Sequence, residues 1–335
     1  MMTQENNGSL TDSKNNDKLI RFVNNRSDNI LLEASEEFTE TPHIRGISER
    51  ALAYLDIGYP IHLLGPAGTG KTTVALHIAA QLGRPVILIH GDDEFTGADL
   101  VGRGTGYHHS KLVDNFIHSV LKTEEEMTTM WTDNRLTTAC EQGYTLIYDE
   151  FNRSRAEANN ALLSVLSEGI LNLPGRRERD GIGYVDVHSN FRAIFTSNSE
   201  EYVGIHKTQN ALADRLIAIK MDYPDQQSEI QIIEKKSTLP RKDIEIIVNL
   251  ARELRLKSEK RPSIRGCIAI ARVLAYHNRH AHADDPIFQA VCQDIFGISK
   301  EFLKQLLHPM DSGLQKRSEK NQESIKKYKT KNQKL

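Results

Sequence analysis

The chain has 335 residues, a length that favours two domains. With 43 Lys and Arg against 45 Asp and Glu, its formal net charge is −2, which argues against a surface built mainly to bind nucleic-acid phosphates. Its apolar runs are too short to cross a bilayer and its first ten residues lack the features of a secretory signal, so we expect a cytoplasmic protein with no membrane partner.

The two ends of the chain differ from its middle in composition. Residues 1–37 are rich in Asn, Ser, Asp, Glu and Lys and carry mostly isolated apolar residues, which predicts a disordered arm. Over residues 311–335, eight Lys or Arg accompany three Asp or Glu, which predicts a basic, flexible tail. We therefore expect the folded part of the chain to lie within residues 38–310.

Short apolar runs alternate with helical patterns in the first part of this region. The runs predicted to be strands are residues 61–64, 86–89, 145–148, 191–196 and 216–221. Helical patterns follow the first and third of them, at about 71–82 and 155–168. Continuous apolar strands separated by helices are typical of a mostly parallel sheet covered on both faces. The sequence therefore predicts a five-stranded α/β domain over residues 38–224.

After Pro224 only helical patterns remain. They cover about residues 229–236, 241–257, 263–278 and 286–306. In the second of them, Ile244, Ile247, Val248, Ala251 and Leu254 recur at helical spacing. These patterns predict a small α-helical lid domain over residues 225–310.

A phosphate-binding motif lies between the first predicted strand and its helix. The residues Gly65-Pro66-Ala67-Gly68-Thr69-Gly70-Lys71-Thr72 match the P-loop pattern, and Thr73 follows as a further nucleotide-binding candidate. The glycines let backbone amides turn toward a triphosphate, and the helix N-terminus favours its negative charge. In such a loop Lys71 reaches the β- and γ-phosphates and Thr72 offers its hydroxyl to Mg²⁺. The motif therefore predicts ATP and Mg²⁺ as ligands.

Two adjacent acids, Asp149 and Glu150, end the third predicted strand. Strand alternation points them in different directions, so they can serve different purposes. Asp149 is the candidate support for Mg²⁺, through the water shell of the ion, and Glu150 is the candidate base that deprotonates the attacking water. The second acid favours hydrolysis of ATP over binding alone, so we expect an ATP hydrolase.

Three further polar residues are candidates for the same site. Asn198 follows the fourth strand and is placed to hold the attacking water or to sense the γ-phosphate. Arg215 precedes the fifth strand, and its permanent charge suits the charge that builds on a transferring phosphoryl group. Arg265 begins a lid helix and could report the nucleotide state to the lid. Lys71, Glu150, Asn198 and Arg215 make up the predicted catalytic set.

In this order the motifs resemble those of AAA+ ATPases. Phe151-Asn152-Arg153 and the helix that contains residues 159–163 resemble the MoxR branch of that class. Four further segments, residues 40–42, 50–55, 59–63 and 91–102, are similar in sequence to the gas vesicle protein N family. The resemblance covers about residues 38–305.

The resemblance implies a function that composition cannot indicate, ATP-dependent assistance in gas vesicle formation or enlargement by an assembly chaperone or remodeller. It also implies that Arg215 is an arginine finger for a neighbouring subunit, that Asn198 is the first sensor and that Arg265 is the second. One finger per chain serves every site only in a head-to-tail ring, so we expect a homo-oligomer, a hexameric ring. Arg153 and Arg155 are further candidates for contacts between subunits.

Two segments are candidates to touch a client, residues 102–130, which interrupt a usually short link, and residues 169–189. The second predicts a hairpin, because an alternating strand follows a glycine-containing turn. Gas vesicle shell or scaffold proteins are the partners that the resemblance implies. The expected location is the cytoplasm, in association with the gas vesicle.

Other functions fit the same nucleotide motifs. A MoxR-type chaperone for metalloenzyme maturation differs from the main hypothesis only in its partner. A nucleic-acid-remodelling ATPase gains some support from Arg176, Arg177, Arg179 and the basic tail, but the acidic core makes nucleic acid an unfavoured partner. A small-molecule kinase shares the P-loop, whereas Glu150 favours water as the phosphoryl acceptor.

Overall fold

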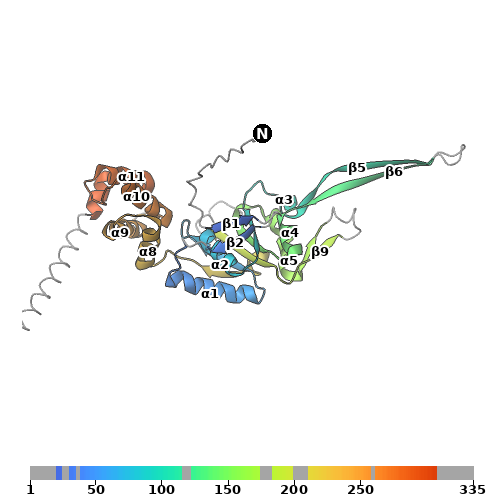
Figure 1. Cartoon of the computed structure of the whole chain (residues 1–335), viewed down its shortest axis with the longest axis horizontal. Coiled ribbons are helices and arrows are strands. Elements are labelled where there is room, and N and C mark those ends of the chain that lie inside the picture. Colours follow the sequence, from blue (N-terminus) through green and yellow to red (C-terminus); the bar gives the residue numbers. More distant parts are fainter. Residues whose placement is uncertain are drawn as a thin grey trace, which may run out of the picture.

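The computed structural model describes residues 20–24, 30–34, 38–114, 122–173, 183–198, 210–257 and 261–307. These residues form an α/β body and, beside it, a smaller group of helices that we call the lid (Figure 1). The predicted class, a mostly parallel sheet with helices on both faces and a helical lid, is confirmed. No helix in the described ranges has the length and apolar character needed to cross a membrane.

The main sheet has seven strands in the order β1-β2-β4-β7-β10-β3-β11. The five predicted strands are β3 (Ile61–Gly65), β4 (Pro85–His90), β7 (Thr145–Asp149), β10 (Arg192–Asn198) and β11 (Ile217–Lys220), and neighbouring pairs among them are all parallel. Because the strands are parallel, the carboxyl ends of β3, β7 and β10 lie at one edge of the sheet, where open α/β sheets bind ligands.

Two strands of the main sheet come from the arm that the sequence predicts to be disordered. The strands β1 (Ile20–Asn24) and β2 (Ile30–Ala34) form an antiparallel pair, and β2 pairs antiparallel with β4. The prediction for residues 1–37 is therefore corrected at these strands, and the sheet is larger than the five strands expected. The prediction of disorder rested on side-chain composition, whereas these strands form by backbone hydrogen bonding. An exposed sheet edge offers unpaired backbone groups to any segment that can extend along it, whatever its side chains.

Helices cover both faces of the sheet. On one face lie α1 (Pro42–Asp56) and α2 (Lys71–Gln81), and on the other lie α3 (Gly97–Val101), α4 (Arg135–Gln142) and α5 (Ala156–Glu168). Each face has its own apolar core. Along β7, Ile147 packs in the core beneath α1 and α2, whereas Leu146 and Tyr148 pack in the core beneath α3, α4 and α5. Every residue of β7 is buried, which explains why the predicted strands are continuous apolar runs.

The lid contains α8 (Gln226–Lys236), α9 (Arg241–Lys257), α10 (Ile264–Tyr276) and α11 (Pro286–Phe296) around its own apolar core. The prediction of one helix over residues 286–306 is wrong. Gly297 ends α11 in the left-handed conformation, with φ of 64°, and helical residues resume at 300–307. A glycine at this position favours a stop over continuation, because left-handed backbone costs it no strain.

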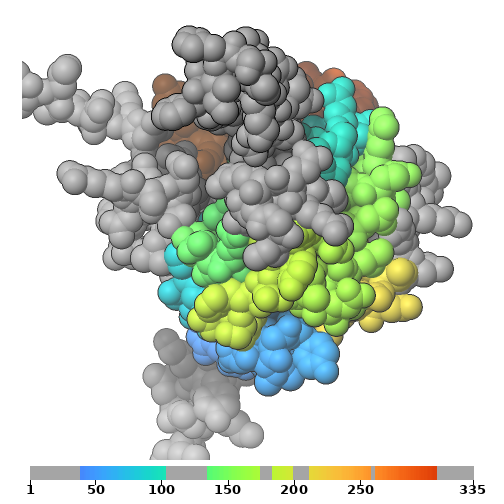
Figure 2. All heavy atoms as spheres, turned by 90° about the vertical axis from the view of Figure 1, so that its right-hand side faces the viewer, coloured from blue at the N-terminus to red at the C-terminus, as the bar shows by residue number. Residues whose placement is uncertain are grey.

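Two hairpins extend from the α/β body on the side away from the lid (Figure 1). The longer one, which we call the ribbon, consists of the antiparallel strands β5 (Gly102–Asp114) and β6 (Lys122–Asp133). It begins where the segment predicted to touch a client begins, and it ends three residues beyond that segment, which was predicted to end at residue 130. The shorter pairs β8 (Ile170–Asn172) with β9 (Tyr184–Asp186), which confirms the predicted hairpin. Its turn residues 180–182, and Arg176, Arg177 and Arg179, lie outside the described residues. Figure 2 looks onto this side, and the brown lid appears only behind the body.

Candidate active site

The P-loop connects β3 to α2 at the carboxyl edge of the sheet. Gly70 caps α2 with φ of 88°, and Gly68 has φ of 75°, a backbone region that residues with side chains rarely adopt. Gly68 also touches the lid, since a Cβ added there would lie 2.2 Å from the Cβ of Ser263. Glycine at position 68 is therefore required both by the turn and by the close approach of the lid.

Lys71 and Asn198 meet at the P-loop. The Nζ atom of Lys71 donates to the carbonyl oxygens of Gly65 (2.9 Å) and Pro66 (2.7 Å) and to Asn198 Oδ1 (2.6 Å). Asn198 stands opposite Gly65 in the parallel register of β10 and β3, which explains how residues 127 positions apart come together. Lys71 is 6% exposed, and its hydrogen bonds to the Gly65 and Pro66 carbonyl oxygens hold its ammonium at the P-loop, where positive charge attracts an anionic ligand.

Asp149 lies at the end of β7, with its carboxylate nearly buried. Its Oδ1 accepts hydrogen bonds from Thr72 Oγ1 (2.7 Å) and Thr196 Oγ1 (2.5 Å). The predicted metal pair, Thr72 and Asp149, is therefore in direct contact. A carboxylate beside a hydroxyl oxygen suits Mg²⁺, which keeps several waters and takes few protein ligands next to phosphate oxygens.

Two residues beside Asp149, Thr196 and His90, were not predicted as site residues. The Thr196 hydroxyl also accepts a hydrogen bond from the Glu150 backbone N–H (2.9 Å), so it holds both acids of the pair. The Nδ1 atom of His90 lies 3.4 Å from Asp149 Oδ2. Both residues lie near the ends of strands that pair directly with β7, and a polar residue in that place is the sequence signal that marks them.

Glu150 leaves the strand in a left-handed conformation, with φ of 51°. Its Oε1 accepts a hydrogen bond from Asn198 Nδ2 (3.3 Å), and its Oε2 forms an ion pair with Arg153 (2.7 Å). The two adjacent acids thus have different side-chain partners, as expected. Both strand alternation and the left-handed turn at Glu150 direct the two side chains apart. The Glu150 side chain is 35% exposed, which leaves room for a water molecule at the carboxylate.

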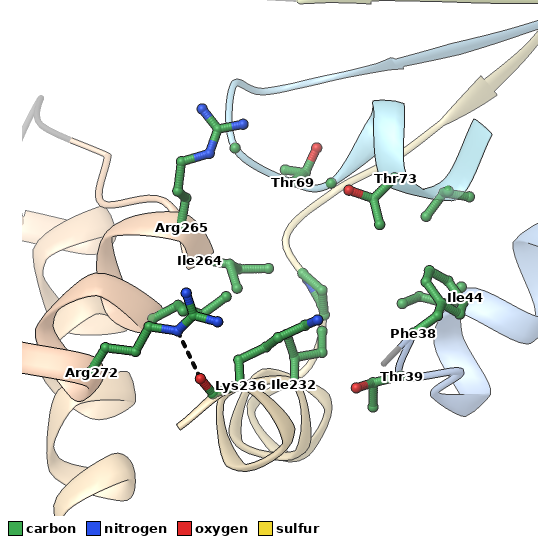
Figure 3. Close-up of a pocket in the computed structure, with 15 residues that line it drawn as sticks. Phe38, Thr39, Ile44, Thr69, Thr73, Ile232, Lys236, Ile264, Arg265 and Arg272 are labelled. Atoms are coloured by element: carbon green, nitrogen blue, oxygen red, sulfur yellow. Dashed lines mark hydrogen bonds between the residues drawn. The ribbon is translucent and has the colours of Figure 1, made fainter. Parts of the chain in front are cut away.

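A cavity of about 340 Å³ is lined by residues of the P-loop and of the lid (Figure 3). Five of the predicted nucleotide-binding residues line it, namely Gly68, Thr69, Gly70, Thr73 and Arg265. An apolar wall is formed by Phe38, Ile44, Ile232, Ile264 and Ile268, and Lys236 and Arg272 add positive charge. Its volume lies in the range of small-molecule sites, and an apolar wall beside cationic groups suits a base joined to phosphates.

Several of these lining residues were not predicted from the sequence. Phe38 and Ile44 come from the entrance to α1, whereas Ile232, Lys236 and Arg272 come from the lid. Arg272 donates from Nε to the Lys236 carbonyl oxygen (2.9 Å), which ties α10 to the end of α8 (Figure 3). No local motif marks such residues, because the cavity forms only when the lid packs beside the P-loop.

Arg215 is the predicted catalytic residue that the fold keeps apart from the other three. In the described part of the chain none of the four lines the cavity, but hydrogen bonds join Lys71 to Asn198 and Asn198 to Glu150. The Arg215 guanidinium donates to the Ser167 hydroxyl and to the Ala211 carbonyl oxygen (2.5 Å), which holds it against α5 and α7 (Asn210–Ala213). The structure therefore brings together Lys71, Asp149, Glu150 and Asn198, but not Arg215.

His62, on β3, is a buried titratable residue near enough to Lys71 to feel its charge. Its Nε2 lies 2.7 Å from Ser197 Oγ. Burial, and secondarily the nearby charge of Lys71, lowers the pKa of His62 from 6.5 to about 4. The folded protein therefore keeps this imidazole neutral over a pH range in which the unfolded chain takes up a proton.

We expect His62 to make the protein less stable as the pH falls from 6.5 toward 4. Because protonation favours the unfolded chain in that range, the free energy of unfolding falls by about 1.4 kcal/mol per pH unit, or about 2 kcal/mol by pH 5. Urea unfolding of the wild type and of His62→Gln at pH 7 and pH 5 measures this contribution. The loss is expected to be smaller in the variant by that amount, and an equal loss in both proteins would contradict it.

The chain also matches known proteins. Residues 60–216 match the family model described as AAA domain (dynein-related subfamily). Over 259 residues the chain is 49% identical to "Gas vesicle ATPase GvpN" of Ancylobacter aquaticus, covering 77% of this chain and 72% of the relative. It is 42% identical to "Gas vesicle ATPase GvpN1" of Halobacterium salinarum, over 78% of this chain and 73% of that one. The chain belongs to the gas vesicle ATPase GvpN family.

This membership confirms the family resemblance and the enzyme class predicted from the sequence. As a member of the GvpN family with an AAA domain, the protein is an ATP-hydrolysing enzyme. A more distant match, "Protein NorQ" of Paracoccus denitrificans, is 30% identical over 58% of this chain and 64% of its own length, in keeping with the MoxR branch.

Proposed function

We propose that this GvpN-family chain uses ATP hydrolysis to assist gas vesicle formation or enlargement, as an assembly chaperone or remodeller. The observation that carries the proposal is the 49% identity to the Ancylobacter aquaticus gas vesicle ATPase. That identity extends over 259 residues, well beyond the motifs that bind a nucleotide. It therefore includes surfaces that ATP chemistry alone does not require.

ATP binds between the P-loop and the lid. The base lies against the apolar wall of the cavity, and the triphosphate follows the P-loop amides of residues 65–73 toward Lys71. The Thr72 hydroxyl and, through water, Asp149 would hold Mg²⁺, which would supply positive charge to the phosphate oxygens. Arg265, at the start of α10, acts as the second sensor and links the nucleotide to the lid.

Hydrolysis uses Glu150 and Asn198. Glu150 accepts the proton of the attacking water at its carboxylate, while the water oxygen bonds to the γ-phosphorus and the bond to the ADP oxygen breaks. Asn198, in contact with both Lys71 and Glu150, positions that water relative to the phosphate. The Thr196 hydroxyl keeps the backbone of Glu150 and the carboxylate of Asp149 in fixed relative positions.

A second subunit completes the site. Arg215 is held on α5 and α7, apart from the hydrogen bonds that join Lys71, Asn198 and Glu150 of its own chain, so it is available to a neighbouring one. If every chain gives its arginine to the next, the assembly closes as a head-to-tail ring, which we propose to be a hexamer. Arg153 and Arg155, in the segment that follows the acids, are further contacts between subunits.

The two hairpins are the proposed client contacts. Both extend from the body on the side away from the lid, so a client can bind them without blocking the cavity (Figure 1). We propose gas vesicle shell or scaffold proteins as clients, and a cytoplasmic protein associated with the vesicle. Neither nucleic acid nor membrane is part of the proposed function.

Capture by an ATP-bound variant tests this function. Glu150→Gln is incubated with ATP in lysate of a vesicle-forming cell and recovered with its bound proteins, in parallel with a Glu150→Gln protein in which an Asn-Gly turn replaces residues 104–131. This turn suits a two-residue hairpin and retains the base of the ribbon. We expect gas vesicle proteins with the first protein and at least about tenfold less of them with the second, because the ribbon is lost.

The other outcomes count against the proposal. Recovery of an apo-metalloenzyme would favour a MoxR-type maturation chaperone, and recovery of chromosomal DNA would favour a nucleic-acid remodeller. Equal recovery of gas vesicle proteins by both variants would place client binding elsewhere than on the ribbon. The ATPase activity of the shortened protein, measured with Glu150 intact, is the control and is expected to stay within about twofold of the wild type.

A further inference from the structure

A buried ion pair in the lid joins three of the segments that surround the nucleotide cavity. Glu229, in the first turn of α8, is 1% exposed and accepts from Arg255 (2.5 Å) and Arg252 (3.2 Å) of α9. The Arg255 side chain is 9% exposed. Such a buried pair adds little to stability in comparison with apolar residues, but it demands one geometry.

Arg255 reaches beyond Glu229 in two directions. Its Nε donates to the Pro262 carbonyl oxygen (2.7 Å), directly before Ser263 begins α10. Its guanidinium lies over the Tyr223 ring, 4.0 Å from the ring centroid, in the link between β11 and α8. Arg252 adds a bond to the Pro224 carbonyl oxygen (3.2 Å) in the same link. One guanidinium therefore contacts the interdomain link, α8 and the segment before α10.

The segment that Arg255 holds is the one that meets the P-loop. Ser263 caps α10, because its hydroxyl accepts a hydrogen bond from the Gly266 backbone N–H (3.1 Å), and it contacts Gly68 of the P-loop. Arg265 follows two residues later and lines the cavity, as does Ile264 (Figure 3). Pro224 of the interdomain link lines it as well. A shift of the Pro262 carbonyl would therefore move the lid side of the nucleotide site.

We propose that Arg255 and Glu229 are positioning residues for the nucleotide site. They fix the interdomain link and the start of α10, so that Ser263 meets Gly68 and Arg265 faces the cavity. The inference rests on the proposed function insofar as ATP occupies that cavity. The planar fork of arginine is needed, because one side chain must bond a carboxylate and a carbonyl oxygen while it stacks on an aromatic ring.

The test compares variants that separate position from folding. Glu229→Leu/Arg255→Met removes both charges together, which avoids leaving one buried charge unpaired. Arg255→Lys keeps the charge but loses the fork. We expect both to unfold cooperatively and to raise the KM for ATP at least about tenfold and about threefold, respectively. Arg241→Ala is the matched control, because Arg241 of α9 also forms an ion pair with a glutamate of α8, Glu234, but on the surface. Its KM is expected to match the wild type.

A double-mutant cycle with Arg265→Ala identifies the route of the effect. If Arg255 acts by placing Arg265, the tenfold effect of Glu229→Leu/Arg255→Met falls below about threefold when Arg265 is already absent. A wild-type KM for ATP in folded Glu229→Leu/Arg255→Met or in folded Arg255→Lys would overturn the inference. It would also be overturned if the effects on KM of Arg265→Ala and of Glu229→Leu/Arg255→Met multiply fully in the cycle. Lys71→Ala is measured in parallel: ATPase activity that does not depend on Lys71 would overturn the assigned ATP site instead, so the two failures are distinguishable.

Discussion

Glu150→Gln is expected to bind ATP as the wild type does and to lower the rate of its cleavage about 10²- to 10⁴-fold, the range that general-base catalysis supplies. The substitution keeps the size of the side chain and the carbonyl oxygen that can accept from Asn198 Nδ2. It removes the carboxylate that takes the proton of water. Nucleotide affinity from isothermal titration calorimetry and phosphate release under saturating ATP together measure the two effects.

Glu157→Gln is the matched control for this experiment. Glu157 is an exposed acid in the first turn of α5, seven residues after Glu150, and its replacement is expected to leave phosphate release unchanged. Normal phosphate release from Glu150→Gln would refute the assignment of the base. Loss of ATP binding by that variant would instead show that Glu150 contributes to the ground-state complex.

Arg215→Ala is expected to retain ATP affinity within about threefold and to lose at least about 10²-fold in turnover, since an arginine finger contributes about 10³ to 10⁵ to the rate. The reason for the split is that Arg215 is held by Ser167 and Ala211, apart from Lys71 and the P-loop of its own chain, to which the ground-state contacts are assigned. Arg50→Ala is the control, because Arg50 is likewise an arginine that donates to a carbonyl oxygen four residues earlier on a helix. Unchanged turnover of Arg215→Ala would rule out the finger.

Mixing two inactive variants tests whether Arg215 acts between subunits. Lys71→Ala lacks a working P-loop but carries Arg215, whereas Arg215→Ala has the P-loop and lacks the finger. In a mixed ring, a Lys71→Ala subunit can complete the site of an Arg215→Ala neighbour, so we expect turnover well above the sum of the two separate proteins. Failure of exchanged mixtures to regain activity would contradict a finger supplied by the neighbour.

The core of the site could be predicted from sequence because each part has a local signature. The P-loop residues 65–72 form a contiguous motif, and Asp149 and Glu150 directly end a buried strand. Once the strands are taken as parallel, their carboxyl ends lie at one edge, which is why Asn198 was expected near the acids and lies in contact with Lys71 and Glu150. Thr196 and His90 were not predicted, because a polar residue near a strand end marks many positions and the register is needed to choose those beside Asp149.

The errors in the fold prediction also have physical causes. Strands β1 and β2 depend on backbone pairing with the edge of β4, an energy that no residue in the arm reveals by itself. The break at Gly297 depends on one backbone conformation inside an otherwise helical pattern. The ribbon was recognised only as an unusual insertion, since its two strands pair with each other and not with the main sheet.

The sequence by itself determined the α/β class with its helical lid, the P-loop and the acid pair, because these follow from periodicity and contiguous motifs. Only the tertiary structure decided which distant residues share the cavity, that Arg215 lies outside it, and that Arg255 joins the interdomain link to the start of α10. The physical reason is that such contacts arise from the packing of one element on another, and residues that meet in this way carry no common pattern along the chain.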